Sequence, residues 1–412
     1  MSRVPSFGAT WVVALRNVAR QGHRTALGVA AVMFGVAAMV LTAGFVEWMF
    51  WGMREDTIRS RLGHLQIART GYRDLGAADP NRFLLPAAAP ELALIEATPG
   101  VVAVAPRLQV NGLASHGDTT LAFVGEGLDP AREEQLSGAG VVTAGERLSA
   151  ADPRGVAVGG GLARNLGVKV GDTLVLLVNT PRGGLNGVEV RVRGIFATST
   201  KAFDDSVIRL PLATARELAR VPGAHRWVVV LDDTDRTDAV GAALAGMLGA
   251  KGYEVVPWHE LADFYRKTVT LFSRQVAVVQ LIVGVIIVLS ISNTLMLAVR
   301  ERTAEIGTVL ALGLRRRQVL AQFLAEGVLI GCFGAIAGAV LGGSIAQVVS
   351  TIGIPMPPPP GMEIGLSGEI RLTLPLLANA VALGLVTTML ASLYPAWTAA
   401  RLEIVDALRH NR

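Results

Sequence analysis

The sequence predicts an α-helical membrane protein with four transmembrane helices and a large α+β extracytoplasmic domain between the first and second helices. The chain of 412 residues is 51% hydrophobic and only 17% charged, whereas soluble domains carry about 25% charged residues. Four apolar runs are each long enough to cross a bilayer, which takes about 20 residues. Alternating strand and helix patterns fill the segment between the first two runs.

The stretch FGATWVVALRNVARQ predicts an amphipathic helix within residues 1–24. Helical spacing places four apolar residues on one face: Phe7, Trp11, Leu15 and Val18. Arg16, Asn17 and Arg20 fall elsewhere on the helix. Such a helix lies on the inner surface of the membrane or docks on the helical bundle as an ordinary helix, and the two interpretations are compatible.

The apolar runs predict transmembrane helices at residues 25–50, 271–299, 321–350 and 372–400. A cleaved signal peptide is the less favoured interpretation of the first run, because that run is too long and 24 residues precede it. The stretch HELADFYRKTVTLFSRQVAVVQ runs into the second helix without a helix breaker, so we expect a continuous stalk there. The prolines at 355–360 predict a stiff turn in the loop 351–371.

Arginine placement predicts the orientation of the chain. Cytoplasmic loops of membrane proteins are rich in Lys and Arg, and three segments have this character: the N-terminal flank, the loop 300–320 and the tail 401–412. The loop 351–371 has only Arg371. We therefore expect both termini and the loop 300–320 in the cytoplasm, and residues 51–270 on the other side of the membrane.

Residues 51–270 contain two strand–helix–strand patterns. HLQIA, APELALIEAT and VVAVAP form the first, and RWVVVL, TDAVGAALAGMLGA and YEVVPW form the second. Two such units predict a split βαβ arrangement. The glycine-rich segment between them reads as further strands, so we expect a β-rich subdomain inserted at about residues 107–212.

Catalytic and cofactor motifs are sparse. The sequence has no G-x-x-x-x-G-K-[ST] motif and no G-x-S-x-G motif, so we expect neither a P-loop nucleotide site nor a hydrolase elbow. His259 and Asp263 have a spacing that suits a metal, but a third ligand is not evident and a solvated helix face is the favoured interpretation. Cys332 is the only cysteine, which excludes a disulfide within the chain. The basic residues lie at membrane borders, which does not favour nucleic acid.

The second and fourth apolar runs contain no ionisable residue, and Glu326 lies at the cytoplasmic start of the third. Ionisable groups inside a membrane commonly mark ion or proton pathways. Their absence from these two runs argues against a proton-coupled carrier, so the energy must come from another source.

Three motifs carry a resemblance to a known family. ERTAEIGTVLALGLRRRQVLAQFLAEGVLIG resembles the signature of FtsX-like, MacB-type ABC transporter permeases, and ALRNVARQGHRTALG and YPAWTAARLEIVDALR resemble the family's N- and C-terminal signatures. GHLQIARTGYRD and LARNLGVKVGDTLVL look most like the lipoprotein-releasing (LolC/LolE) branch. The resemblance covers essentially the whole chain and implies the architecture of a type VII ABC exporter.

The resemblance implies a mechanism and partners. Two permease chains, identical or related, associate with two copies of a separate ATPase that binds ATP and Mg, and this chain holds no cofactor itself. The loop 300–320 would be the coupling helix that docks on the ATPase. The residues implied at that contact are Glu301, Arg302, Glu305, Ile306, Gly307, Ala311, Leu312 and Gly313. The residues expected at the membrane surface are Trp11, Arg16, Arg20, Arg24, Arg315, Arg316 and Arg317.

Two departures from the family pattern bear on partners and cargo. Leu310 stands where the family often has arginine, and the segment 179–187 is too short for the hook that recruits a periplasmic chaperone in some lipoprotein-releasing permeases. The cargo implied is a lipoprotein or another lipid-linked or amphipathic molecule. The alternatives are an efflux permease with an adaptor and an outer-membrane channel, a regulator of a cell-wall hydrolase, and a membrane sensor without an ATPase.

Overall fold

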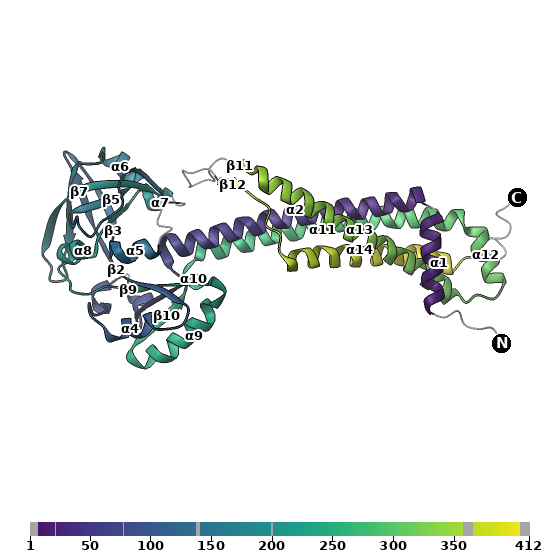
Figure 1. Cartoon of the computed structure of the whole chain (residues 1–412), viewed down its shortest axis with the longest axis horizontal. Coiled ribbons are helices and arrows are strands. Elements are labelled where there is room, and N and C mark those ends of the chain that lie inside the picture. Colours follow the sequence, from purple (N-terminus) through teal and green to yellow (C-terminus); the bar gives the residue numbers. More distant parts are fainter. Residues whose placement is uncertain are drawn as a thin grey trace. The chain divides into compact units, whose positions relative to one another are not determined.

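The computed structural model describes residues 7–20, 22–76, 78–136, 141–198, 201–356 and 366–403. The chain divides into two compact units: residues 1–50, 269–354 and 367–412 form a helical unit, and residues 51–268 and 355–366 form an α/β unit (Figure 1). Part of the expected proline turn, the tail beyond residue 403 and the side chain of Arg24 lie outside what the structure describes.

The helical unit is built from long helices. Its elements are α1 (Phe7–Arg20), α2 (Gly22–Thr57), α11 (Asp263–Glu301), α12 (Thr303–Ala311), α13 (Arg316–Ile352) and α14 (Leu374–Ala400). Among the described residues, four helices are long and apolar enough to cross a membrane: α2, α11, α13 and α14. Both α2 and α11 extend past the boundaries of the helical unit, at residues 50 and 269.

Glycines let α13 approach two neighbours closely. A Cβ atom at Gly338 would lie 2.5 Å from the carbonyl oxygen of Met33 in α2, and one at Gly331 would lie 2.6 Å from Oγ1 of Thr388 in α14. Small residues at such contacts let helix backbones pack together where the hydrophobic effect between helices is weak. The packing of α13 against α2 and α14 therefore depends on residues without side chains.

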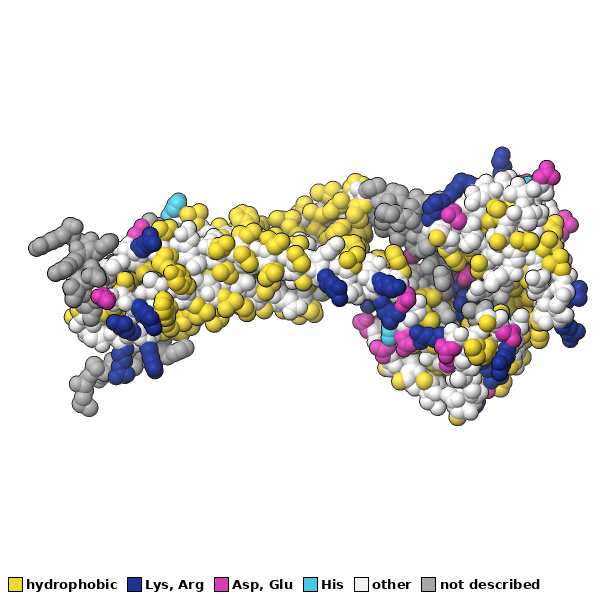
Figure 2. Space-filling model, turned by 180° about the vertical axis from the view of Figure 1, so that it is seen from behind, with side chains coloured by type: hydrophobic (Ala, Val, Ile, Leu, Met, Phe, Trp, Pro, Cys, Tyr) yellow, Lys and Arg dark blue, Asp and Glu magenta, His cyan; other side chains and the backbone are white. Residues whose placement is uncertain are grey.

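The surface of the helical unit matches a membrane environment. Figure 2 shows hydrophobic side chains over the middle of the helices, and Lys and Arg side chains gathered near the end that carries α1 and α12. Large apolar side chains such as Phe34, Ile286 and Val340 are exposed there. An apolar belt of this kind on an assembly of helices is typical of a protein that spans a bilayer.

The α/β unit contains one ten-stranded sheet. Its strands are β1 (Leu65–Arg69), β2 (Val101–His116), β3 (Thr119–Leu128), β4 (Val141–Gly145), β5 (Gly155–Gly159), β6 (Thr173–Asn179), β7 (Leu185–Ala197), β8 (Val207–Pro211), β9 (Arg226–Leu231) and β10 (Tyr253–Pro257). Its helices are α3 (Tyr72–Leu75), α4 (Pro90–Glu96), α5 (Pro130–Leu136), α6 (Gly160–Leu166), α7 (Lys201–Asp204), α8 (Leu212–Ala219), α9 (Thr237–Leu248) and α10 (Trp258–Leu261). Two short strands, β11 (Ile354–Met356) and β12 (Leu366–Gly368), complete the described elements.

The strand order is β10-β1-β9-β2-β3-β8-β5-β7-β4, and β6 pairs with β2 and β7. The first four strands have the order of a split βαβ unit, in which β9 lies between β1 and β2 and is antiparallel to both. One apolar core lies around these strands and includes Leu65, Ile95 and Trp227. A second core lies around β3 and β5–β8 and includes Leu108 and Leu176.

The boundaries of the second core differ from the expected insertion at 107–212. The strand β2 runs through Arg107 without a break, pairing with β9 in its first half and with β3 in its second. The core also continues through α8 to Val221. The two cores therefore share a strand, because a single long strand can serve both parts of a twisted sheet.

The expected continuous helix into the second span begins at Asp263 and not at His259, and from there α11 runs to Glu301 without a break. The chain leaves the helical conformation at Ala262 (φ −90°, ψ 63°), which separates α10 from α11. Trp258 and Ala262 are buried against Ile58 and Leu62 of the π-helical turn that follows α2, and this packing fixes the break. His259 and Asp263 consequently lie on different helices, where His259 bonds to Asp238 and Asp263 to Arg266.

Candidate functional site: the polar junction around α12

The segment 300–320 contains the end of one helix, a separate short helix and the start of a third. α11 ends at Glu301, α12 begins at Thr303, and α13 begins at Arg316. Arg302 lies between the first two helices with a non-helical backbone (φ −97°, ψ 12°). Gly313 turns the chain before α13 with a φ of 98°, which side chains other than glycine rarely tolerate.

One face of α12 packs into the helical unit itself. Ile306 and Leu310 are buried with Val319 and Phe323 of α13 and with Ala399 of α14. Gly307 is buried beside them. Ile306 and Gly307 therefore hold α12 in place within the chain, and little of Ile306 is accessible to a partner. The same burial suits an apolar side chain at Leu310.

Glu305 lies on the opposite, polar face of α12. Its carboxylate accepts hydrogen bonds from the Arg302 guanidinium at 3.2 Å and from the Arg20 guanidinium at 3.0 and 3.1 Å. Burial alone would raise the pKa of the Glu305 carboxyl, but the hydrogen bonds from Arg302 and Arg20 outweigh it and hold the pKa below its usual range. Glu305 is thus an anion that two cations of the same chain already neutralise.

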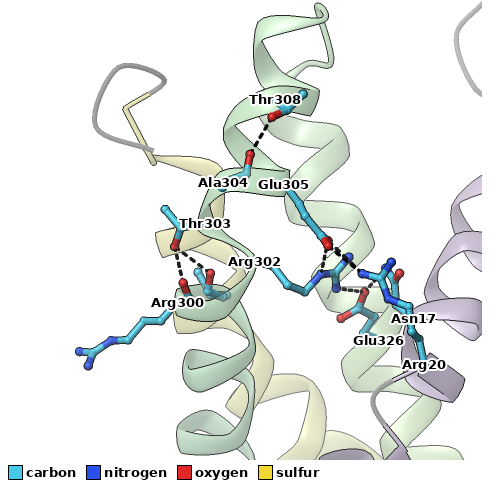
Figure 3. Close-up of polar contacts among 10 residues, drawn as sticks. Asn17, Arg20, Arg300, Arg302, Thr303, Ala304, Glu305, Thr308 and Glu326 are labelled. Carbon is cyan, nitrogen blue, oxygen red and sulfur yellow. Dashed lines mark hydrogen bonds and ion pairs between the residues drawn. The ribbon is translucent and has the colours of Figure 1, made fainter. Parts of the chain in front are cut away.

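Glu326 of α13 lies further inside the junction (Figure 3). Its carboxylate accepts a hydrogen bond from Nδ2 of Asn17 at 2.7 Å and forms an ion pair with the Arg302 guanidinium at 3.3 Å. This contact shows how α1 docks on the helical unit. Asn17 points toward α13 and Ala14 is fully buried, whereas Leu15 is half exposed, because α1 docks on the helices through its small and polar residues.

The remaining predicted residues divide into two groups. Glu301, Ala311, Leu312 and Gly313 have exposed side chains or backbone on the outer side of α12. Arg16, Arg315, Arg316 and Arg317 are exposed, and Trp11 is half-buried. Arg20 forms an ion pair with Glu305 and its side chain is still 61% exposed, so this pair is compatible with the expected place at the membrane surface.

Sequence reasoning missed the role of Asn17 and named Glu326 only as a boundary residue. A single acid in an apolar run is a signal that a partner must lie nearby, because an unpaired buried carboxylate is costly. No pattern in the sequence indicates that the partner comes from α1, which is 309 residues away from Glu326.

Two family models match the chain. The model of the MacB-like periplasmic core domain matches residues 25–247, which is more than half of the chain, and the model of the FtsX-like permease C-terminal region matches residues 277–404. The two matches together include most of the α/β unit and all four candidate membrane helices in full or in large part.

Several curated proteins are similar in sequence. The macrolide export ATP-binding/permease protein MacB of Rhodospirillum rubrum is 29% identical over 98% of this chain, but the alignment covers 60% of that protein. The lipoprotein-releasing system transmembrane protein LolC of Xylella fastidiosa (strain 9a5c) is 25% identical over 78% of this chain and 80% of that protein. LolC of Neisseria meningitidis serogroup B is 23% identical over 94% of both.

Solved structures are more distant. The periplasmic region of MacB from Actinobacillus actinomycetemcomitans aligns with 50% of this chain and 93% of that chain, with 11% identity and a TM-score of 0.35. The family models and the four candidate membrane helices suffice: this chain belongs to the family of ABC transporter permeases that combine a MacB-like periplasmic core domain with an FtsX-like permease region.

Proposed function

We propose that this chain is the transmembrane subunit of an ATP-driven transporter that works with a separate ATPase docking on α12. The carrying observation is the outer side of α12, where Leu312 is 80% exposed and lies next to three exposed arginines, Arg315 to Arg317. We take Leu312 as an apolar anchor for the partner, and the arginines beside it belong to a residue type that is enriched at interface hot spots. ATP and Mg would bind on that partner, in two copies, and a second permease chain, identical or related, would complete the assembly.

The same proposal includes the orientation. Both termini and α12 would face the cytoplasm, where ATP is available, and the α/β unit would face the periplasm across the bacterial inner membrane. The arginines near α12 support this orientation through the positive-inside rule. Motion of α12 would then pass through α11 and α13, which continue from it on either side.

The cargo we propose is a lipoprotein or another lipid-linked or amphipathic molecule that leaves the inner membrane. Similarity to two LolC proteins over 78% and 94% of this chain supports it. The second candidate is export of small amphipathic compounds with an adaptor, and the similarity to a MacB protein over 98% of the chain favours it. Identification of lipid-linked species that co-purify with the full complex tests the choice.

Substitution of Leu312 tests the docking surface. Leu312→Asp places a charge on the proposed anchor without touching the buried face of α12. We expect co-purification of the ATPase to fall at least about tenfold, which corresponds to the loss of about 1.4 kcal/mol of binding free energy. The matched control is Leu185→Asp, because Leu185 is 67% exposed and lies in the α/β unit. Undiminished ATPase binding by the Leu312→Asp chain would overturn the docking site.

Glu305 needs a separate design because Arg20 and Arg302 already bind it. Glu305→Arg alone breaks these internal contacts as well as any contact with a partner. The exchange Arg20→Glu with Glu305→Arg restores an opposite-charge pair between α1 and α12 while reversing the charge on the surface. If Glu305 contacts the ATPase, the exchanged chain binds it as poorly as Glu305→Arg does; recovery of binding would assign Glu305 an internal role only.

A further inference from the structure

The starting point is the environment of Glu326. Its side chain is buried, and the carboxylate has two partners on two other elements: Asn17 of α1 at 2.7 Å and Arg302 at 3.3 Å. A buried carboxylate is tolerated only when charge and hydrogen bonds compensate the loss of water. Glu326 therefore ties α13 to α1 and to the link before α12.

A small cavity of about 20 Å³ borders the same carboxylate. Its walls include Asn17 of α1, Thr25 of α2, Thr294 of α11 and Glu326 of α13. The space is large enough for about one water molecule; the four side chains named form its polar part, and the remaining walls are apolar. Glu326 thus lies where four helices of the helical unit meet, and what holds its carboxylate affects all of them.

Arg302 connects Glu326 on α13 to Glu305 on α12. Its Nε atom donates to Glu305 on α12 at 3.2 Å, and its Nη1 atom donates to Glu326 on α13 at 3.3 Å. Arg302 is also the non-helical residue where the chain changes direction between α11 and α12. A guanidinium with donors in a fixed, planar arrangement holds both carboxylates in one geometry.

The contacts form a closed path that begins and ends on α1 (Figure 3). Asn17 bonds to Glu326, Glu326 to Arg302, Arg302 to Glu305, and Glu305 to Arg20. Asn17 and Arg20 are three residues apart, a spacing that places them on neighbouring positions of one helix face. One face of α1 therefore binds α13 through Asn17 and α12 through Arg20.

We propose that Glu326 is a positioning residue that, through Arg302 and Asn17, makes α1 part of the coupling element, so that α1 and α12 move together. In this role α1 holds α12 and α13 together, in addition to any contact with the membrane surface. The fixed geometry follows from contacts within this chain. Its effect on ATP hydrolysis rests on the proposed function as well.

Distances between spin labels test the geometry without an ATPase. The labels are placed at Val12 of α1 and Thr308 of α12, both exposed, in a Cys332→Ala chain in lipid nanodiscs. We expect one narrow distance distribution for this background. Glu326→Ala should widen it by about twofold, because Arg302 loses one of its two anions and Asn17 its acceptor.

Two further variants control this result. Gln322→Ala, one helical turn earlier in α13, should leave the distribution unchanged, because Gln322 has no hydrogen bond among the described residues. Asn17→Leu removes the contact from the α1 side and leaves α13 intact, so it should widen the distribution even if Glu326→Ala fails to fold. Distributions for Asn17→Leu and Glu326→Ala that match the background would overturn the positioning role.

A second measurement separates this inference from the proposed function. In the complex with the ATPase, Asn17→Leu should lower the maximal rate of ATP hydrolysis severalfold while the KM for ATP stays unchanged, since α1 does not touch the nucleotide. A purely structural role would instead lower the amount of folded complex and leave its turnover unchanged. If the unmodified chain binds no ATPase, the proposed function fails, while the label distances still decide the role of Glu326.

Discussion

Each unit of this protein buries a cluster of opposite charges, and the two clusters differ in whether they extend to the protein surface. In the α/β unit, Glu126 pairs with Arg209 and Arg226 at 3.6 Å each, and the Arg209 and Glu126 side chains are each 5% exposed. Arg107 and Glu133 form a second pair there at 2.8 Å. We call this the sealed cluster, and its residues lie on β2, β3, β8, β9 and α5.

The cluster in the helical unit leads from the interior to the surface. The exposed fraction of the side chain rises from 6% for Glu326 and 11% for Arg302 to 55% for Glu305 and 61% for Arg20. A buried cluster without an exposed member can only stabilise or specify a fold. A graded cluster, whose exposure rises from one member to the next, can pass the effect of a contact at its exposed end to its buried end. The difference assigns a structural role to the first and a role in coupling to the second.

The largest effect is expected in the sealed cluster. Glu126→Gln keeps the shape of the side chain but leaves the buried Arg209 without its carboxylate partner. Loss of one partner of a buried ion pair costs about 3–5 kcal/mol. Hydrogen exchange of β3 and β8 in the full chain measures it, with Glu217→Gln as the control because Glu217 pairs with Arg154 in an exposed position. Equal protection in both variants would contradict the sealed character of the cluster.

Acid should affect the α/β unit before it affects the α12 junction. Burial is the main cause that lowers the pKa of His225 from 6.5 to about 4, and the nearby charge of Arg226 adds to it. Since the pKa is lower in the folded state, the stabilisation is complete above pH 6.5 and is lost as the pH falls toward 4. The loss is about 3 kcal/mol at most.

The measurement compares hydrogen exchange at pH 7 and pH 5 in the full chain. His225→Gln should reduce the change in the α/β unit without removing it, because burial also lowers the pKa of His64 there. His116→Gln, at an exposed position, should leave the change intact. The pKa of Glu305 is lowered, so its contacts with Arg20 and Arg302 persist through this range and are lost only in stronger acid. Loss of protection in α12 between pH 7 and 5 would show that the two regions do not differ in this way.

The sequence anticipated what local patterns determine. Four apolar runs correspond to α2, α11, α13 and α14, and the alternating segments correspond to β1, β2, β9 and β10. Contacts distant in sequence decided the rest. Ala262 is a residue that favours helix, yet it interrupts one because Trp258 packs against Ile58, about 200 residues earlier.

The candidate site shows the same limit. The motif identified α12 and Glu305, and the arginines indicated the charged end of the bundle. The motif did not distinguish the buried face of α12, with Ile306 and Leu310, from the exposed one, because that requires knowing where α13 and α14 lie.

Strand β8, which carries Arg209, was not predicted from the sequence either, since a short segment with a central charge has no clear period.

The smallest effect on stability is expected at the exposed end of the graded cluster. Arg20→Gln removes an ion pair whose two side chains are both more than half exposed. Exposed pairs contribute less than about 1 kcal/mol, because water and salt screen them. Thermal unfolding of the full chain should therefore be nearly unchanged. The same substitution should loosen α1 from α12, since Glu305 then keeps only Arg302. The distribution of distances between labels at Val12 and Thr308 should therefore widen although the unfolding temperature hardly changes. If the distribution widens only as far as a lower unfolding temperature explains, Arg20 has a structural role like that of the charges in the sealed cluster.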